Sequence, residues 1–362
     1  MSRFAAITFG VLAAAVAALA PAWAQTKGRD RPTGPVLVKE SASKELCEEA
    51  SNRLFVSSFV GTECIAYYAT PAIPGSSVAI LYFNGDLSND DLRDKSVAPD
   101  FIGSFSASAR ILAEKSGVQI VFMARPGTFG SSGDHALRGE RREMFVMNAA
   151  VDALKARLGV SSLIVTGQSR GSQVAASLLT MRRSDIRCAV LGSGVLHAVE
   201  FEQRHARARG RELNVENLRT ALYDPGSYLS EVVTDPARRI LVLGDRADTI
   251  THFDLQERFA SKLKALGHHA AVLEIKAQGR EMHGATHMVL PAAIMCAKGS
   301  SDQDIGWVVR PPDEKPAPRP PATEPSSQLP PRAPLAPTSG PSRNVSDGAD
   351  PMPAPKPRAG RL

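Results

Sequence analysis

The chain of 362 residues carries a formal net charge of +6, from 43 lysines and arginines against 37 aspartates and glutamates. This excess is small and spread along the chain, and the one basic cluster, residues 204–211, lacks aromatic side chains for base stacking, so a nucleic-acid partner is not expected. The four cysteines form no Cys-x-x-Cys motif, which argues against zinc binding and thioredoxin-like chemistry.

The first 24 residues have the pattern of a secretory signal peptide. Arg3 precedes an uncharged apolar run, residues 4–20, and the small-residue site Ala22-Trp23-Ala24 follows. We therefore expect cleavage after Ala24 and a periplasmic or secreted protein, with a retained membrane anchor as the alternative. Because no later segment is apolar enough to span a bilayer, no integral membrane segment is expected after the signal is removed.

Between residues 25 and 310 the sequence alternates between strand and helix patterns. The expected strands are residues 64–69, 78–83, 118–123, 162–166, 188–191, 240–243 and 271–276, and the expected helices are residues 101–115, 140–158, 172–181, 255–266 and 288–297. Runs that are apolar at all positions but one, such as residues 118–123, are typical of strands that are covered on both faces. The alternation predicts one α/β domain with a mostly parallel central sheet and helices on both faces.

Two segments depart from this alternation. Residues 194–237 combine helical pieces and loops between two strands, so they form either a small cap over the catalytic end of the sheet or a long connection. Residues 311–362 are dominated by Pro, Ala, Ser and Arg and are expected to be disordered, because proline removes backbone donors and no apolar periodicity remains. This tail either contacts cell-envelope components or is a solvated segment with no specific role.

The pentapeptide Gly167-Gln168-Ser169-Arg170-Gly171 directly follows a β-branched strand and directly precedes a helix. In such a turn the glycines permit a tight backbone, and the serine hydroxyl is exposed at the carboxyl end of the sheet. Backbone N–H groups and the helix dipole then stabilise negative charge beside the serine. We expect Ser169 to be a nucleophile; a glycine-rich turn without chemistry is the alternative.

A serine nucleophile needs a base and a carboxylate that orients this base. The strand at residues 240–243 ends in a turn with two aspartates, of which Asp248 lies deeper and is the predicted acid, with Asp245 as the alternative. Two histidines follow the next strand. His287 lies just ahead of a helix and is preferred as the base; His283, nearer the strand end, is the alternative.

An oxyanion site requires two backbone N–H groups. We expect one from Arg170, directly after the nucleophile, and one from Asp86, in the loop after residues 78–83 where Gly85 lets the backbone come close. Arg125 ends the following strand and either buttresses the loops or binds a substrate carboxylate. The predicted substrate-binding residues at this rim are Asn84, Gly85, Arg125 and Gln168.

The four cysteines can form disulfides in an exported protein. Cys47 and Cys64 flank a short helix-to-strand segment and are the expected pair. Cys188 and Cys296 form a second candidate pair.

Together these motifs resemble the α/β-hydrolase superfamily over about residues 60–297. The resemblance rests on the elbow at Ser169, on Arg125-Pro126-Gly127, on the acid turn from Gly244 to Asp248, and on the chain order Ser, Asp, His. Asn84 stands where this superfamily often has histidine, and this departure affects the placement of the second oxyanion donor. The stretch from Tyr223 to Asp248 also resembles secreted prolyl-oligopeptidase-like serine hydrolases, although no propeller domain precedes it.

The resemblance implies an exported serine hydrolase that cleaves carboxylic esters of a small-molecule acyl substrate. The reaction would pass through an acyl-enzyme on Ser169 and would need no metal or organic cofactor. A serine peptidase or an acyltransferase with the same triad is one alternative. A non-catalytic binding protein of the cell envelope that retains the hydrolase fold is another.

Overall fold

The computed structural model of the protein describes residues 43–88, 90–91, 97–279 and 281–310. The predicted signal peptide, residues 1–24, and the predicted tail, residues 311–362, lie outside the described residues. Every element named below belongs to one compact unit within residues 1–315. Within the described ranges, no helix is both long enough and apolar enough to cross a bilayer.

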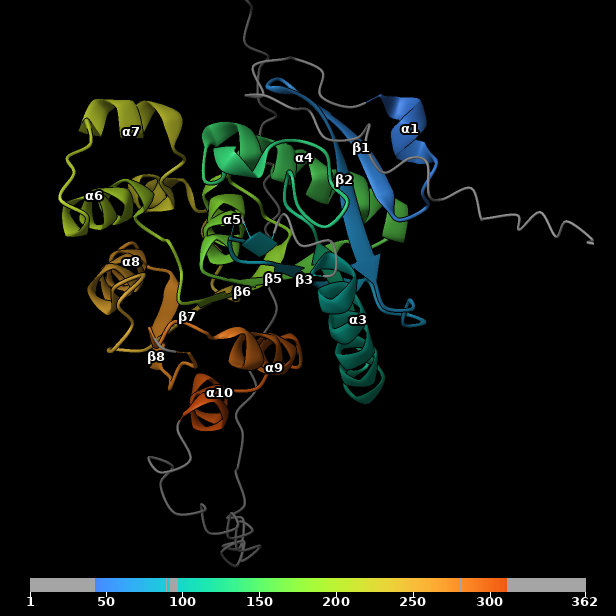
Figure 1. The fold of residues 1–362 in the computed structure, drawn as a ribbon. Helices are drawn as coiled ribbons and strands as arrows, with labels where there is room; N and C mark the ends of the chain where they lie inside the picture. The colour runs from blue at the N-terminus through green and yellow to red at the C-terminus, as the bar shows by residue number, and fades with distance from the viewer. Residues whose placement is uncertain (1–42, 89, 92–96, 280, 311–362) are drawn as a thin grey trace, which may run out of the picture. The chain divides into compact units, whose positions relative to one another are not determined.

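One eight-stranded sheet organises this unit (Figure 1). In spatial order its strands are β1 (Arg53–Ser58), β2 (Gly61–Ala69), β4 (Gln119–Met123), β3 (Val78–Phe83), β5 (Ser162–Gln168), β6 (Ile186–Gly192), β7 (Arg239–Gly244) and β8 (His269–Glu274). β2 pairs antiparallel with β1 and β4, and the pairs from β4 to β8 are parallel. The predicted α/β architecture with a mostly parallel central sheet is therefore confirmed.

Helices cover both faces of this sheet (Figure 1). The helices are α1 (Lys44–Glu48), α3 (Val97–Ser116), α4 (Arg141–Leu158), α5 (Arg170–Thr180), α6 (Ala198–Ala208), α7 (Val215–Ala221), α8 (Phe253–Ala265), α9 (Thr286–Ala297) and α10 (Asp302–Val309). Side chains of α4, α5 and α8 share one buried apolar cluster with the sheet, and side chains of α3, α9 and α10 share a second. Burial of apolar surface on both faces is what stabilises a parallel sheet of this kind.

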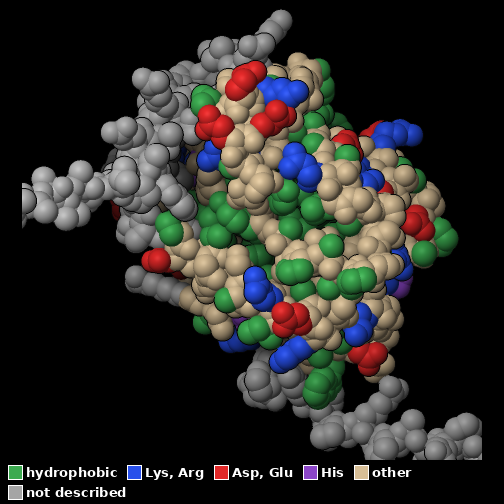
Figure 2. Space-filling model, turned by 90° about the vertical axis from the view of Figure 1, so that its right-hand side faces the viewer, with side chains coloured by type: hydrophobic (Ala, Val, Ile, Leu, Met, Phe, Trp, Pro, Cys, Tyr) green, Lys and Arg blue, Asp and Glu red, His purple; other side chains and the backbone are tan. Residues whose placement is uncertain are grey.

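Each predicted strand and helix of the body is present, with shifts of a few residues at the ends. The edge strand β1 was not predicted, because its sequence contains polar residues and its side chains alternate between buried and more exposed. The turn between β1 and β2 places Phe59 in solvent with 81% of its surface exposed. On the face shown in Figure 2, charged side chains of both signs are mixed with hydrophobic ones.

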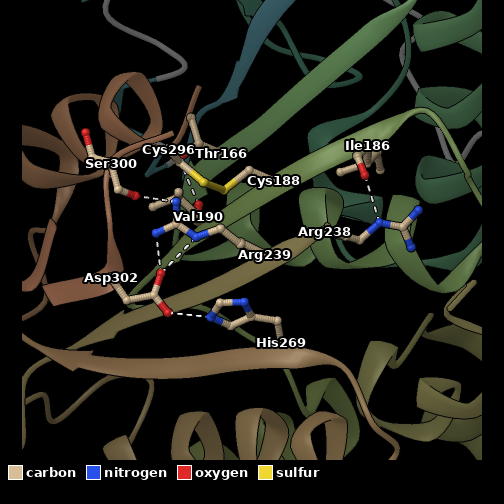
Figure 3. Close-up of a disulfide and its surroundings, with 10 residues drawn as sticks. All are labelled: Thr166, Ile186, Cys188, Val190, Arg238, Arg239, His269, Cys296, Ser300 and Asp302. Carbon is tan, nitrogen blue, oxygen red and sulfur yellow. Dashed lines mark hydrogen bonds and ion pairs between the residues drawn. A yellow bond between two sulfur atoms is a disulfide. The ribbon is translucent and has the colours of Figure 1, made fainter. Parts of the chain in front are cut away.

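Both predicted disulfides are present. Cys47–Cys64 joins α1 to β2, and Cys188–Cys296 joins β6 to α9 (Figure 3). Beside the second disulfide, Asp302 at the start of α10 accepts hydrogen bonds from Arg239 at 2.8 Å and pairs with the His269 ring at 2.7 Å. The segment that follows the late histidines is therefore attached covalently and through charged groups to the sheet.

Removal of the Cys188–Cys296 disulfide is expected to lower the free energy of unfolding by about 4–5 kcal/mol. This bond closes a loop between residues 108 positions apart, and the entropy of the unfolded chain rises most when a long loop is opened. The matched variant is removal of Cys47–Cys64, which spans 17 positions and is expected to cost about 3 kcal/mol. Urea denaturation of the two Cys→Ser double variants measures both values, and a larger loss for the shorter loop would contradict the prediction.

Candidate active site

Ser169 occupies the turn between β5 and α5 in a backbone conformation that side chains rarely adopt, with φ 57° and ψ −123°. Glycine is required on both sides of it. A Cβ at Gly167 would lie 2.5 Å from the carbonyl carbon of Gly171, and a Cβ at Gly171 would clash with the backbone oxygen of Phe83. The strained turn is therefore held by close backbone packing, and the predicted elbow geometry at Ser169 is present.

The loop after β3 passes beside this turn. In the parallel pair β3–β5, Phe83 lies opposite Gly167, so the residues that follow each strand meet at the carboxyl edge of the sheet. A Cβ at Gly85 would lie 2.9 Å from Oε1 of Gln168 and 3.4 Å from Cβ of Ser169. The close approach predicted for Gly85 is present, and Asp86 follows it directly.

Asp248 lies at the turn after β7 and is 4% exposed. Its Oδ1 accepts hydrogen bonds from the backbone N–H groups of Ile250 and Thr251, at 2.8 and 3.0 Å. Its Oδ2 accepts from the Thr251 hydroxyl at 2.7 Å and lies 3.0 Å from Nδ1 of His283. Burial raises the pKa of Asp248, but the interactions with His283 and Thr251 outweigh this effect and lower it, so the carboxylate is charged at neutral pH.

Asp245, the alternative acid, is also buried but has a different environment. Its Oδ1 accepts from the Ala247 N–H at 2.8 Å and its Oδ2 from the Ala277 N–H at 2.9 Å. These bonds attach the turn after β7 to the chain that leaves β8. The carboxylate of Asp245 therefore holds backbone, whereas that of Asp248 faces a histidine.

The histidine paired with Asp248 is His283, the alternative base, and not the preferred His287. The loop that carries His283 is attached to both neighbours, because Nε2 of Gln168 donates to the His283 carbonyl at 3.0 Å and the Thr249 N–H donates to the Glu281 carbonyl at 3.1 Å. His283 thus lies between the elbow and the turn after β7. The Gln168 side chain, which was predicted to bind substrate, holds the loop of His283 to the elbow.

His287 was preferred because the last helix was expected to begin at residue 288. α9 instead begins at Thr286, so His287 is already in its first turn and is exposed to solvent. Gln278 and Gly284 form an antiparallel bridge, and a Cβ at Gly284 would lie 2.9 Å from the Gln278 carbonyl oxygen. Glycine directly after a histidine was the signal in the sequence that favoured His283.

Arg125 buttresses the loops. It is fully buried, and it donates to Glu143 at 2.7 Å, to Asp86 Oδ1 at 2.9 Å and to the Asn84 carbonyl at 3.3 Å. Asn84 is also buried and donates through Nδ2 to the Gly85 carbonyl at 2.7 Å. The hydrogen bonds of Arg125 therefore support the loop after β3, which is the first of the two roles considered for this residue.

Two further residues, which the sequence did not indicate, hold this loop. His135 is buried, and its Nε2 accepts the backbone N–H of Leu87 at 3.2 Å. Arg138 donates through Nε to Asp86 Oδ2 at 2.9 Å. Both residues follow β4 and are separated from the loop by about fifty positions of sequence, so no local pattern indicates the contact.

Stability is expected to fall between pH 7 and pH 5 because of two buried histidines. Burial lowers the pKa of His135 and of His197 from 6.5 to about 4. The positive charge of Arg125 adds to this effect at His135, and that of Arg258 adds to it at His197. Below pH 6.5 the unfolded chain therefore binds protons that the folded chain does not. At pH 5 this difference lowers the free energy of unfolding by about 2 kcal/mol per histidine. Above pH 7 neither state binds these protons, and the two histidines cause no further change in the free energy of unfolding.

Urea denaturation at pH 7 and pH 5 measures this loss. His135→Gln keeps a hydrogen-bond acceptor and removes the titrating ring, so its stability difference between the two pH values is expected to be smaller by about 2 kcal/mol. An unchanged difference in this variant would contradict the prediction.

α6 lies beside the elbow and the acid turn. Arg170, directly after Ser169, pairs with Glu202 of α6, and its guanidinium lies 5.2 Å from the centre of the Phe201 ring. His205 of α6 contacts the Ile250 carbonyl through Nε2 at 2.9 Å. Part of residues 194–237 is thus in contact with both the turn at Ser169 and the turn after β7.

No family model matches the chain, and no curated protein matches its sequence. Solved structures of similar fold include Est1E from Butyrivibrio proteoclasticus, with a TM-score of 0.49 and 12% identity over 69% of this chain and 98% of that one. The Pyrococcus furiosus esterase Pf2001 has a TM-score of 0.47 and 15% identity, over 74% of this chain and 96% of that one. A Pyrococcus horikoshii acylaminoacyl peptidase has a TM-score of 0.46 and 16% identity, over 69% of this chain and 41% of that one. This likeness concerns the fold alone.

Proposed function

We propose that the chain is a serine hydrolase with Ser169 as nucleophile, His283 as general base and Asp248 as the carboxylate that orients this base. The observation that carries the proposal is the 3.0 Å contact between Asp248 Oδ2 and His283 Nδ1, in a loop that is attached to the nucleophile turn through Gln168. A carboxylate on Nδ1 fixes the tautomer whose Nε2 accepts a proton.

In the proposed mechanism His283 Nε2 takes the proton of the Ser169 hydroxyl as its oxygen attacks the carbonyl carbon of the substrate. The backbone N–H groups of Arg170 and Asp86 stabilise the resulting oxyanion. Protonated His283, stabilised by Asp248, returns the proton to the leaving group, and an acyl-enzyme forms. Water then attacks the acyl carbon with His283 again as base, which releases the acid and restores the Ser169 hydroxyl.

We propose carboxylic esters as the substrate class. An amide nitrogen must be protonated before its bond to the tetrahedral carbon breaks, whereas an ester oxygen leaves without full protonation, so an ester places the smaller demand on His283 as an acid. We also propose that the protein is exported to the periplasm or secreted. The signal-peptide pattern at residues 1–24 supports export, and so do the two disulfides, which persist in oxidising compartments.

Stoichiometric labelling of the wild-type protein by a fluorophosphonate tests the serine chemistry. Mass spectrometry of the labelled peptide identifies the modified residue, and Ser169 is expected. A panel of p-nitrophenyl esters, thioesters and N-acyl aminoacyl anilides separates the substrate classes. A higher kcat/KM for anilides indicates a peptidase, and transfer to an added alcohol in preference to water indicates an acyltransferase. Absence of labelling in folded protein would indicate a binding protein.

A further inference from the structure

The two residues proposed to supply the oxyanion N–H groups also meet through their side chains. Nε of Arg170 lies 3.3 Å from Oδ2 of Asp86. Arg170 opens α5, and Asp86 belongs to the loop after β3, so this ion pair connects two separate elements beside Ser169. The Arg170 side chain is 4% exposed and that of Asp86 is 29% exposed, and the pair is therefore poorly screened by water.

The Asp86 carboxylate is fixed from the side of β4. Oδ1 accepts from Arg125 at 2.9 Å, and Oδ2 accepts from Arg138 at 2.9 Å. Burial raises the pKa of Asp86, but the charges of Arg125 and Arg170 outweigh burial and bring the pKa to about 2, so the group is ionised at all ordinary pH values.

The Arg170 guanidinium is fixed from the side of α5 and α6. Its Nη1 donates to Gln173 Oε1 at 2.9 Å, its Nη2 pairs with Glu202, and its plane lies near the Phe201 ring. The Nε–H is buried and forms no hydrogen bond, so the Asp86 carboxylate is the group that faces its charge on this side. Gly139 leaves the space that the guanidinium fills, because a Cβ there would clash with Nη1.

An oxyanion site depends on the spacing of its donors, and a displacement of about 1 Å at such a site costs about 10²-fold in rate. The N–H of Arg170 is fixed by α5, but that of Asp86 belongs to a loop outside the sheet ladder. We propose that the Arg170–Asp86 side-chain pair is a positioning device that fixes the separation of the two oxyanion N–H groups. This inference rests on the proposed function.

The test uses Asp86→Asn, Arg170→Gln and the double variant, all of which keep both backbone N–H groups. Each single variant is expected to lower kcat by about 30–100-fold with KM changed by less than about threefold, because the loss falls on the transition state. Affinity for a trifluoromethyl ketone, which forms an oxyanion on the serine, is expected to fall by the same factor. The double variant is expected to lose no more kcat than either single variant, since each single variant already breaks the same Arg170–Asp86 ion pair.

Arg183→Gln is the matched control. Arg183 is likewise buried and pairs with two carboxylates, Asp152 and Asp185, but it precedes β6 at the end of that strand opposite to the elbow. This control is expected to lower Tm and to leave kcat and ketone affinity unchanged. Arg170→Lys keeps the positive charge, and it is expected to bind the ketone more tightly than Arg170→Gln does. If Arg170→Gln does not fold, Arg170→Lys replaces it in the comparison.

Three results would overturn the inference while leaving the proposed function intact: wild-type kcat and ketone affinity in the Asp86 and Arg170 variants, losses that add in the double variant, or an equal loss of kcat in Arg183→Gln. Wild-type protein that is folded and is not labelled by a fluorophosphonate would overturn the proposed function, and this inference with it. The labelling is therefore measured first.

Discussion

Ser169→Ala is expected to abolish fluorophosphonate labelling and to lower kcat/KM for an ester substrate by about 10⁵-fold or more. The physical reason is that the acyl-enzyme cannot form without the hydroxyl, and the remaining groups catalyse only direct attack by water. The backbone at residue 169, with φ 57°, is tolerated by alanine as poorly as by serine, so stability is expected to change little. Labelling stoichiometry and initial rates at equal protein concentration measure the effect.

Ser172→Ala is the matched control for this variant. Ser172 lies three positions further along α5, is fully buried, and its hydroxyl contacts the carbonyl oxygens of Gly167 and Gly192 at 2.7 and 2.9 Å. Its removal is expected to cost about 1 kcal/mol of stability and to leave labelling stoichiometric. Labelling that persists in Ser169→Ala, or that disappears in Ser172→Ala, would place the reactive serine elsewhere.

His283→Ala is expected to lower kcat/KM by about 10⁴-fold, whereas His287→Ala is expected to lower it by less than about threefold. Of the two histidines, His283 contacts a carboxylate, with its Nδ1 3.0 Å from Oδ2 of the buried Asp248. His287 is exposed on the first turn of α9. The two variants remove the same side chain four positions apart, so each serves as the control for the other. Initial rates on one ester decide between them.

Two further observations accompany this comparison. Added imidazole is expected to restore part of the activity of His283→Ala, because it supplies a base in place of the ring that was removed. His283→Ala also leaves the carboxylate of Asp248 buried without its partner, so a loss of stability is expected. Circular dichroism at the assay temperature shows whether the variant is folded when its rate is measured. The opposite ranking, with His287→Ala the inactive variant, would show that the base is His287.

The features that sequence alone indicated are those whose causes lie within a few consecutive residues. The elbow is one, because Ser169 and both of its glycines lie within the five residues 167–171 and are recognised there, although the clash that requires Gly171 is with Phe83 of another strand. The acid turn is another, since Asp248 accepts N–H groups two and three residues ahead of it. The alternation of apolar runs with helical spacing in the same way predicted the strands and helices of the sheet.

Tertiary structure alone decided the features whose partners are far apart in the chain. The pairing of Asp248 with His283, and not with His287, depended on where α9 begins, and α9 packs its buried residues against β5 and β6, far back in the sequence. The contact of Asp86 with Arg125 and Arg170 follows from parallel register, which sets Phe83 opposite Met123 and Gly167 and so brings three strand ends together. Local propensity carries no information on such register, because the free energy that fixes it comes from burial of the assembled sheet.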